Sequence, residues 1–274
     1  MGMGRALALA AALLLCGGTA GFDAHKMKKC ADNAFCKRHR GYADAPGASP
    51  EARGGAYVAT AASLELDGAG ARLLVESARH KVPLELTISA LPGGMTARVR
   101  LREAEPLHPR FEAPYVLVES GTTTAPLALL VKDTDGVTFA LGGKDVGQVR
   151  VDFSPLRVRF FAPAVSPGTE PVEVVTLNAR GLLEYEHYRK RPPPTAAAAE
   201  KVDEEGTEEG GEQAKPEGEA DTDEELVWEE SFQSHKDTRP RGPSSIGLDL
   251  ELPGFSHVFG LPERATSFNL KNTR

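Results

Sequence analysis

The stretch TARVRLR, from Thr96 to Arg102, alternates between apolar and charged side chains. In an extended chain Val99 and Leu101 point to one side of the backbone. The three arginines of the stretch point to the other side: Arg98, Arg100 and Arg102. This alternation is typical of an antiparallel strand that has one buried face and one solvated face.

Short runs of similar character recur on both sides of this stretch, each bounded by Gly, Pro, Asp or Asn. We predict strands in the runs AYVAT (56–60), VPLELTIS (82–89), MTARVRLRE (95–103), PYVLVE (114–119), LALLVK (127–132), GVTFAL (136–141), GQVRVDF (147–153), LRVRFF (156–161) and VEVVTLN (172–178). Turn residues at this spacing are typical of sandwiches built from antiparallel strands. The sequence therefore predicts an all-β fold, an antiparallel β-sandwich.

Two later runs are less uniform. LVWEESFQSH (226–235) brings Trp228 and Phe232 together only if it is helical or bent. SSIGLDLELPG (244–254) alternates again, with apolar residues at every second position: Ile246, Leu248, Leu250 and Leu252. The alternation predicts that the β pattern resumes in the last part of the chain.

The acidity of the chain is confined to one tract. From Glu200 to Glu225 there are thirteen Asp or Glu and two Lys, a local charge of −11, which leaves +4 for the rest of a chain whose total is −7. The tract has no aromatic residue and only Val202 among branched apolar residues, so burial cannot offset the entropy of ordering. We expect residues 192–225 to be a disordered insertion within one sandwich domain, because loop-closure entropy grows slowly with length.

The first 20 residues, MGMGRALALAAALLLCGGTA (1–20), combine a basic Arg5, an apolar run and a small-residue end, as a secretory signal peptide does. The apolar run is shorter than the roughly 20 residues that cross a bilayer, and no later segment is long and apolar enough to do so. We therefore expect no membrane span, and a mature chain that is lumenal or extracellular.

Cleavage of this segment would remove Cys16 and leave Cys30 and Cys36. In an oxidising compartment these two residues predict a small-loop disulfide. A zinc site that included His25 and His39 would need about four well-spaced ligands and is the weaker interpretation. The five residues between the cysteines also differ from a redox Cys-x-x-Cys motif. We predict no metal site.

Basic residues surround the two cysteines: Lys26, Lys28, Lys29, Lys37, Arg38 and Arg40. Such a cluster can bind nucleic acid. A secreted chain rarely meets nucleic acid, so we predict a solvated basic surface and no nucleic-acid partner.

The sequence has no nucleophile elbow, phosphate-binding glycine loop or His-Glu-x-x-His motif, and no cofactor is predicted. The best carboxylate pair is Glu184 and Glu186, which share one face of an extended chain with His187 opposite. Neighbours on one strand seldom face each other across a sugar, as a retaining glycosidase requires. We therefore expect a solvated pair on an edge strand.

Three segments, in this order, carry a family resemblance: KKCADNAFCKRHRG (28–41), NARGLLEYEHYR (178–189) and the run from Trp228 to Ala265. With the acidic insertion between the last two, they resemble glycoside hydrolase family 31 over nearly the whole mature chain. The resemblance implies a galactose-mutarotase-like N-terminal β-sandwich. In the family this domain precedes a (β/α)8 barrel that supplies an aspartate nucleophile and an aspartate acid/base.

The resemblance also implies where the domains of the chain begin and end. It implies a disulfide-containing segment at 21–55 and the β-sandwich domain at 56–274, with the catalytic barrel absent from this sequence. No residue here matches the catalytic aspartates, so none is given a catalytic role.

The stretch GFSHVFGLPERA (254–265) begins like a buried strand and then breaks at Gly260 and Pro262 into a loop. Loops of this kind often carry sites. This loop presents Glu263 and Arg264, and the resemblance implies that they face the mouth of the barrel. We predict these two as binding residues.

The family reaction removes α-linked glucose from immature N-glycans in the endoplasmic reticulum. The resemblance implies a non-catalytic N-terminal part of such an enzyme, with a β-subunit and a glucosylated N-glycan as partners. An independent carbohydrate-binding sandwich stays open, although its only aromatic candidates are Trp228 and scattered Tyr. So does an interaction module that recruits a partner through the acidic tract or the basic N-terminus.

Overall fold

The computed structural model describes residues 24–45, 57–68, 70–78, 80–93, 95–112, 124–142, 146–164, 166, 168–188, 228–239, 244–260 and 269–270. Four predictions lie outside these residues: the signal peptide (1–20), the strand at 114–119, the insertion at 192–225 and the binding residues Glu263 and Arg264. Within the described part, no helix has the length and apolar character needed to cross a membrane.

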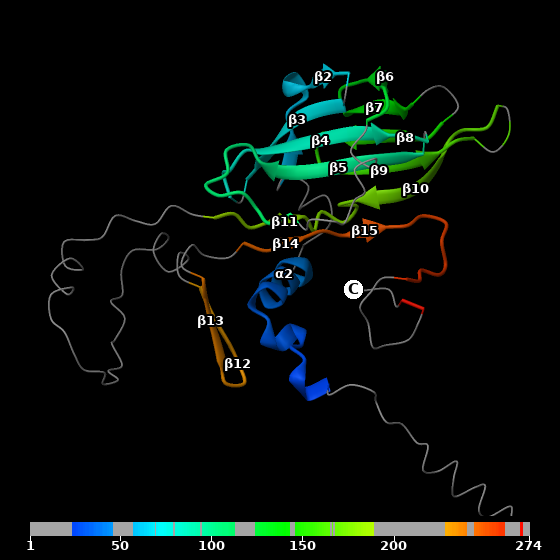
Figure 1. Ribbon diagram of the computed structural model, residues 1–274. Coiled ribbons are helices and arrows are strands. Elements are labelled where there is room, and N and C mark those ends of the chain that lie inside the picture. The colour runs from blue at the N-terminus through cyan, green and yellow to red at the C-terminus, as the bar shows by residue number, and fades with distance from the viewer. Residues whose placement is uncertain are drawn as a thin grey trace, which may run out of the picture. The chain divides into compact units, whose positions relative to one another are not determined.

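One antiparallel sheet takes the order β1-β3-β4-β5, with β2 paired to β3 (Figure 1). Its strands are β1 (Tyr57–Ala59), β2 (Glu65–Asp67), β3 (Gly70–Ser77), β4 (Leu84–Leu91) and β5 (Thr96–Glu103). Leu86 lies opposite Leu73 on one side and Leu101 on the other, so apolar side chains form a row across three strands. Such cross-strand neighbours stabilise the sheet.

The second antiparallel sheet takes the order β15-β10-β9-β8-β7-β6. Its strands are β6 (Leu127–Lys132), β7 (Gly136–Leu141), β8 (Gln148–Asp152), β9 (Arg157–Ala162), β10 (Val172–Leu177) and β15 (Leu250–Glu251). Val149 of β8 lies opposite Phe139 of β7 and Phe160 of β9.

The two sheets share one hydrophobic core. The first sheet contributes Leu73, Leu86 and Ile88, and the second contributes Val137, Phe139, Val149 and Val151. Each of these side chains is at most 2% exposed. The strands that we predicted within the described residues form, and the prediction of an all-β antiparallel sandwich is confirmed.

Two short strand pairs accompany the sandwich in the described residues. β11 (Glu184–Tyr185) pairs with β14 (Ile246–Gly247), and β12 (Trp228–Phe232) pairs with β13 (His235–Arg239). The run at 226–235 therefore enters a hairpin, not a helix. Because β14 and β15 pair with strands that precede the insertion, the chain returns to the same domain after it.

The expected buried strand at the start of 254–265 is wrong. Residues 255–260 form no strand, and Phe255 and Phe259 are 60% and 50% exposed. Gly254 and Gly260 have left-handed backbones with φ of 82° and 83°, which interrupt an extended chain.

By its internal contacts the chain divides into two compact units, residues 1–33 with 255–274, and residues 34–254. The first unit contains the short helices η1 (Ala24–Lys26) and η2 (Cys30–Asp32). The second contains both sheets, η4 (Ala61–Ser63) and the helix α2 (Ala34–Asp44), which we did not predict. Cys30 and Cys36 are both disulfide-bonded, which confirms that a disulfide forms here.

Helix α2 packs closely on the segments around β11 and β14. The Nε2 atom of His39 lies 2.7 Å from the carbonyl oxygen of Leu182. A Cβ atom at Gly247 would lie 3.0 Å from the His39 ring and 3.1 Å from the Phe35 ring. Glycine at 247 therefore permits this close approach.

Arg38 of α2 forms an ion pair with Glu186. The Nε and Nη2 atoms of Arg38 donate to Oε1 of Glu186 over 3.1 and 2.6 Å. The other oxygen, Oε2, accepts the backbone N–H of Ser245 at 2.9 Å, and the N–H of Glu186 donates to the Ser245 carbonyl at 3.0 Å. The carboxylate thus joins α2 to both sides of the insertion.

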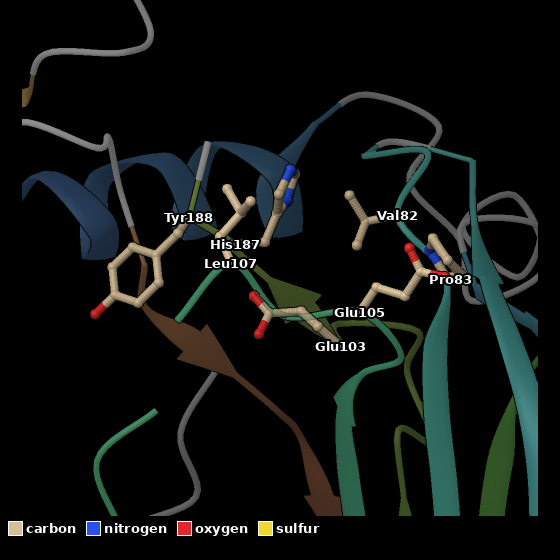
Figure 2. A pocket seen from close by; sticks show the side chains of 7 residues that line it. All are labelled: Val82, Pro83, Glu103, Glu105, Leu107, His187 and Tyr188. Atoms are coloured by element: carbon tan, nitrogen blue, oxygen red, sulfur yellow. The ribbon is translucent and has the colours of Figure 1, made fainter. Parts of the chain in front are cut away.

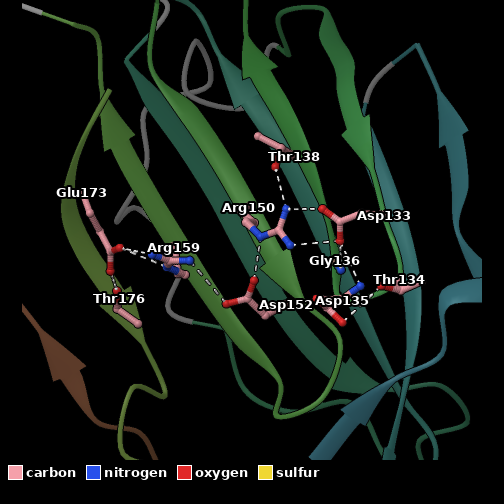
Figure 3. A network of polar contacts seen from close by, with 10 residues as sticks. All are labelled: Asp133, Thr134, Asp135, Gly136, Thr138, Arg150, Asp152, Arg159, Glu173 and Thr176. Carbon is pink, nitrogen blue, oxygen red and sulfur yellow. Dashed lines mark hydrogen bonds and ion pairs between the residues drawn. The ribbon is translucent and has the colours of Figure 1, made fainter. Parts of the chain in front are cut away.

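A polar network covers part of the second sheet (Figure 3). The Asp133 carboxylate accepts two hydrogen bonds from Arg150, at 3.0 and 3.1 Å. Its Oδ1 atom also accepts the backbone N–H groups of Asp135 and Gly136, at 2.9 and 2.8 Å. Arg150, followed by the Asp135 N–H, lowers the pKa of Asp133 from its usual value to about 2.

We predict that Phe139→Ala lowers the free energy of unfolding by about 3–5 kcal/mol, because it leaves a cavity at the centre of the core. Phe139 is 0% exposed, whereas Phe111 is 87% exposed and provides the matched control. Urea unfolding of both variants measures the difference. Equal stability of the two variants would contradict the shared core.

We predict that Arg38→Ala loosens α2 and lowers the free energy of unfolding by about 1–3 kcal/mol, because it leaves Glu186 without its cation. The estimate lies below that for a fully buried pair because Arg38 is 41% exposed. Hydrogen exchange in α2 should speed up. Lys37→Ala on the same helix is the control and should leave exchange unchanged.

We predict that the stabilisation from the Asp133–Arg150 pair depends on pH. Because the folded pKa is depressed, the stabilisation is present above the unfolded value of about 4 and is lost as pH falls through about 2. Urea midpoints of Asp133→Asn and the wild type should differ at pH 7 and converge near pH 2. Glu65→Gln, an exposed change on β2, controls for general effects, and a difference that persists at pH 2 would refute the pairing.

Candidate functional site

A pocket of about 320 Å³ lies at one end of the first sheet (Figure 2). Three segments line it: the residues that lead into β4, the end of β5 with the loop after it, and the residues that follow β11. The lining residues are Val82, Pro83, Glu103, Glu105, Leu107, His187 and Tyr188. Mostly apolar walls with a few polar groups are typical of small-ligand sites.

Arg110 organises the polar side of this pocket. Its Nη2 atom donates to Oε1 of Glu103 at 3.0 Å and to the carbonyl oxygen of Glu186. Its Nη1 atom donates to the carbonyl oxygen of Ser244 at 2.7 Å. Glu103 is 6% exposed, so this ion pair is shielded from water and holds the carboxylate in place.

The Arg110 guanidinium also lies over two aromatic rings. It is 4.5 Å from the ring centroid of Tyr185 and 5.8 Å from that of Tyr188, distances typical of cation–π contacts. Burial raises the pKa of the Tyr185 phenol, and the charge of Arg110 opposes part of that rise. The N–H of Tyr185 donates to the hydroxyl of Tyr57 at 2.8 Å, which fixes the segment against the core.

A second pair borders the pocket. The Nε2 atom of His80 lies 2.6 Å from Oε1 of Glu184, and the two side chains are 15% and 8% exposed. The ring of His187 meets the ring of His80 edge to face at a centroid distance of 5.6 Å. These contacts place His187 beside a buried, hydrogen-bonded pair.

The expectation that Glu184 and Glu186 form a solvated pair on an edge strand is wrong. The two residues are 6% and 7% exposed. Each binds its own partner, His80 for Glu184 and Arg38 for Glu186. Burial of a carboxylate is costly unless it is paired, and these partners supply the compensation.

Sequence reasoning missed Arg110, Glu103 and His80. Arg110 and His80 lie 76 and 104 positions away from Glu186 and Glu184, the residues that they bind near β11, so no local motif links them. Glu103 lies seven positions before its partner Arg110. The available signal in the sequence was the run LLEYE (182–186), in which two carboxylates stand among apolar and aromatic residues, and the structure buries every position of it. A charged residue within such a run indicates a hidden partner.

The predicted binding residues Glu263 and Arg264 lie outside the described residues, so their role stays a prediction. In the part of the chain that the structure describes, no group of three or more His, Cys, Asp or Glu could hold a metal ion. The pocket at His187 is therefore the candidate site that the described residues support best.

Comparison with known proteins gives a consistent result. Neutral alpha-glucosidase AB of Homo sapiens is 34% identical over 274 residues, which cover 93% of this chain and 26% of that protein. The glucosidase II alpha subunit with Glc1Man2 bound matches with a TM-score of 0.65 and 26% identity, over 91% of this chain and 25% of that one. A heterodimeric ER glucosidase II complex, of the catalytic subunit and the binding domain of the regulatory subunit, matches with a TM-score of 0.65 and 27% identity, again over 91% and 25%.

The chain thus spans about a quarter of the length of the curated relatives that it matches. A family model, described as the glycosyl hydrolase 31 N-terminal galactose mutarotase-like domain, matches residues 85–274. This range begins one residue inside β4 and includes β5 to β11, the pocket-lining loop after β5 and the segment after the insertion. The chain belongs to the glycosyl hydrolase 31 family and contains its N-terminal galactose mutarotase-like domain.

Proposed function

We propose that the chain is the non-catalytic N-terminal part of an α-glucosidase that trims α-linked glucose from N-glycans in the lumen of the endoplasmic reticulum. The observation that carries this proposal is the 34% identity to neutral alpha-glucosidase AB across 93% of the chain. The domain model and the fold similarity to the glucosidase II alpha subunit support the same function. The glucosylated N-glycan is the substrate of the whole protein.

The carboxylates of the described sandwich do not suit glycoside hydrolysis. A retaining glycosidase places two carboxyl groups about 5–5.5 Å apart on opposite sides of one sugar. Glu103, Glu184 and Glu186 are instead each held by a different cationic or histidine side chain: Arg110, His80 and Arg38. The reaction therefore belongs to the barrel that the family resemblance implies.

The proposed protein partner is the glucosidase II β-subunit. The similar heterodimeric structure joins a catalytic subunit to the binding domain of a regulatory subunit, which supports an equivalent assembly here. The disulfide at Cys30 and Cys36 is compatible with the oxidising lumen of the endoplasmic reticulum.

We predict that the purified 274-residue chain hydrolyses no chromogenic α-glucoside, whereas a protein extended to the length of the relatives does. The expected difference follows because three buried carboxylates, Glu103, Glu184 and Glu186, are each engaged by Arg110, His80 or Arg38. Release of the chromophore measures turnover. Turnover by the 274-residue chain that Glu263→Gln abolishes would overturn both the non-catalytic assignment and the binding role of the 254–265 loop.

A further inference from the structure

We propose that the pocket lined by Glu103, Glu105 and His187 binds one neutral pyranose ring. The inference rests on the proposed function, because a protein that acts on N-glycans meets such rings at high local concentration. Its physical support comes from the size, the walls and the charge balance of the pocket.

The size and the walls fit a single ring. A volume of about 320 Å³ is at the lower end of the range for small-ligand sites. Val82, Pro83 and Leu107 supply apolar surface, onto which the C–H face of a pyranose can pack. Pro83 and Leu107 are exposed, so the site opens to solvent and a ring within a longer glycan can enter.

The polar groups fit hydroxyl donors. Ionised carboxylates only accept hydrogen bonds, and sugar hydroxyls can donate to them. Glu103 is held by Arg110 through Oε1, which leaves its other oxygen as a pre-oriented acceptor. For Glu105 no hydrogen bond or ion pair is found within the described residues, so its carboxylate can turn toward a ligand without losing a partner.

The charge balance disfavours an anionic ligand, which would meet the carboxylates of Glu103 and Glu105. Arg110 compensates Glu103 and already occupies the cation–π positions over Tyr185 and Tyr188, so an ammonium ligand is attracted by Glu105 alone and finds no free aromatic face there. A neutral polyol avoids repulsion by the carboxylates and uses both of them as acceptors.

The test is an NMR titration of the 274-residue chain with methyl α-D-glucopyranoside and methyl α-D-mannopyranoside, in which backbone N–H shifts are followed. We expect shifts at Glu105, Leu107 and Tyr188, with a dissociation constant on the order of millimolar, as is usual for a ligand of about a dozen heavy atoms at an open site. Glu105→Gln should weaken binding about five-fold, because a neutral acceptor replaces a charged one. Glu65→Gln is the matched control and should bind like the wild type.

Two probes of similar size define the ligand class: cyclohexylammonium is cationic and glucuronate is anionic. Tighter binding of either probe than of the methyl glycosides overturns the assignment of a neutral ring. The absence of shifts up to about 100 mM sugar, or an unchanged constant in Glu105→Gln, overturns the site itself. The titration measures binding and involves no turnover. A chain that binds no sugar, in a protein that hydrolyses α-glucosides when extended, contradicts the pocket proposal alone. Sugar binding by the chain without hydrolysis by the extended protein contradicts the proposed function alone.

Discussion

The carboxylate of Glu186 is the constraint on which the site depends, because it joins segments that are far apart in the sequence. One oxygen binds Arg38 of α2, and the other accepts the N–H of Ser245 beyond the insertion. The main-chain oxygen of the same residue accepts a hydrogen bond from Arg110. Through these contacts a single residue holds the helix, the return segment and the loop after β5 in place around the pocket.

The same geometry explains why the buried carboxylates serve the structure. Each is engaged by a side chain that comes from a different segment: Arg38 for Glu186, His80 for Glu184 and Arg110 for Glu103. A buried charge that loses its partner strongly destabilises the fold. A buried charge whose hydrogen bonds are all made holds the backbone in one arrangement. In this domain the buried carboxylates hold segments in position, and Glu103 in addition lines the pocket beside the exposed Glu105.

Strands with clean alternation were predictable from the sequence. β6 and β7 have the bounds predicted for them. β3 was not predicted, because Leu73 and Leu74 are adjacent in GARLLVES and hide the period of two. Helix α2 was not predicted, because its sequence AFCKRHRGYAD has no apolar stripe. The helix makes polar contacts with the rest of the domain, such as the Arg38–Glu186 pair. The site was only partly predictable, since the partners of Glu184 and Glu186 lie more than 100 positions away and only folding brings them together.

The alternation of apolar and other residues at 244–254 does not by itself tell which face of the segment is buried, as the surroundings of Asp249 show. Its carboxylate accepts the backbone N–H groups of Arg180 and Leu182, at 2.8 and 3.0 Å, so this side chain turns toward the domain. Its neighbours in the alternation, Leu248 and Leu250, are consequently 41% and 62% exposed. Two unsatisfied N–H groups would cost about 1–3 kcal/mol each, and burying the two leucines would gain roughly 2 kcal/mol each, so the hydrogen bonds offset that gain. The hydrogen bonds of Asp249 to the 180–182 segment therefore set which side of residues 248–250 faces the domain.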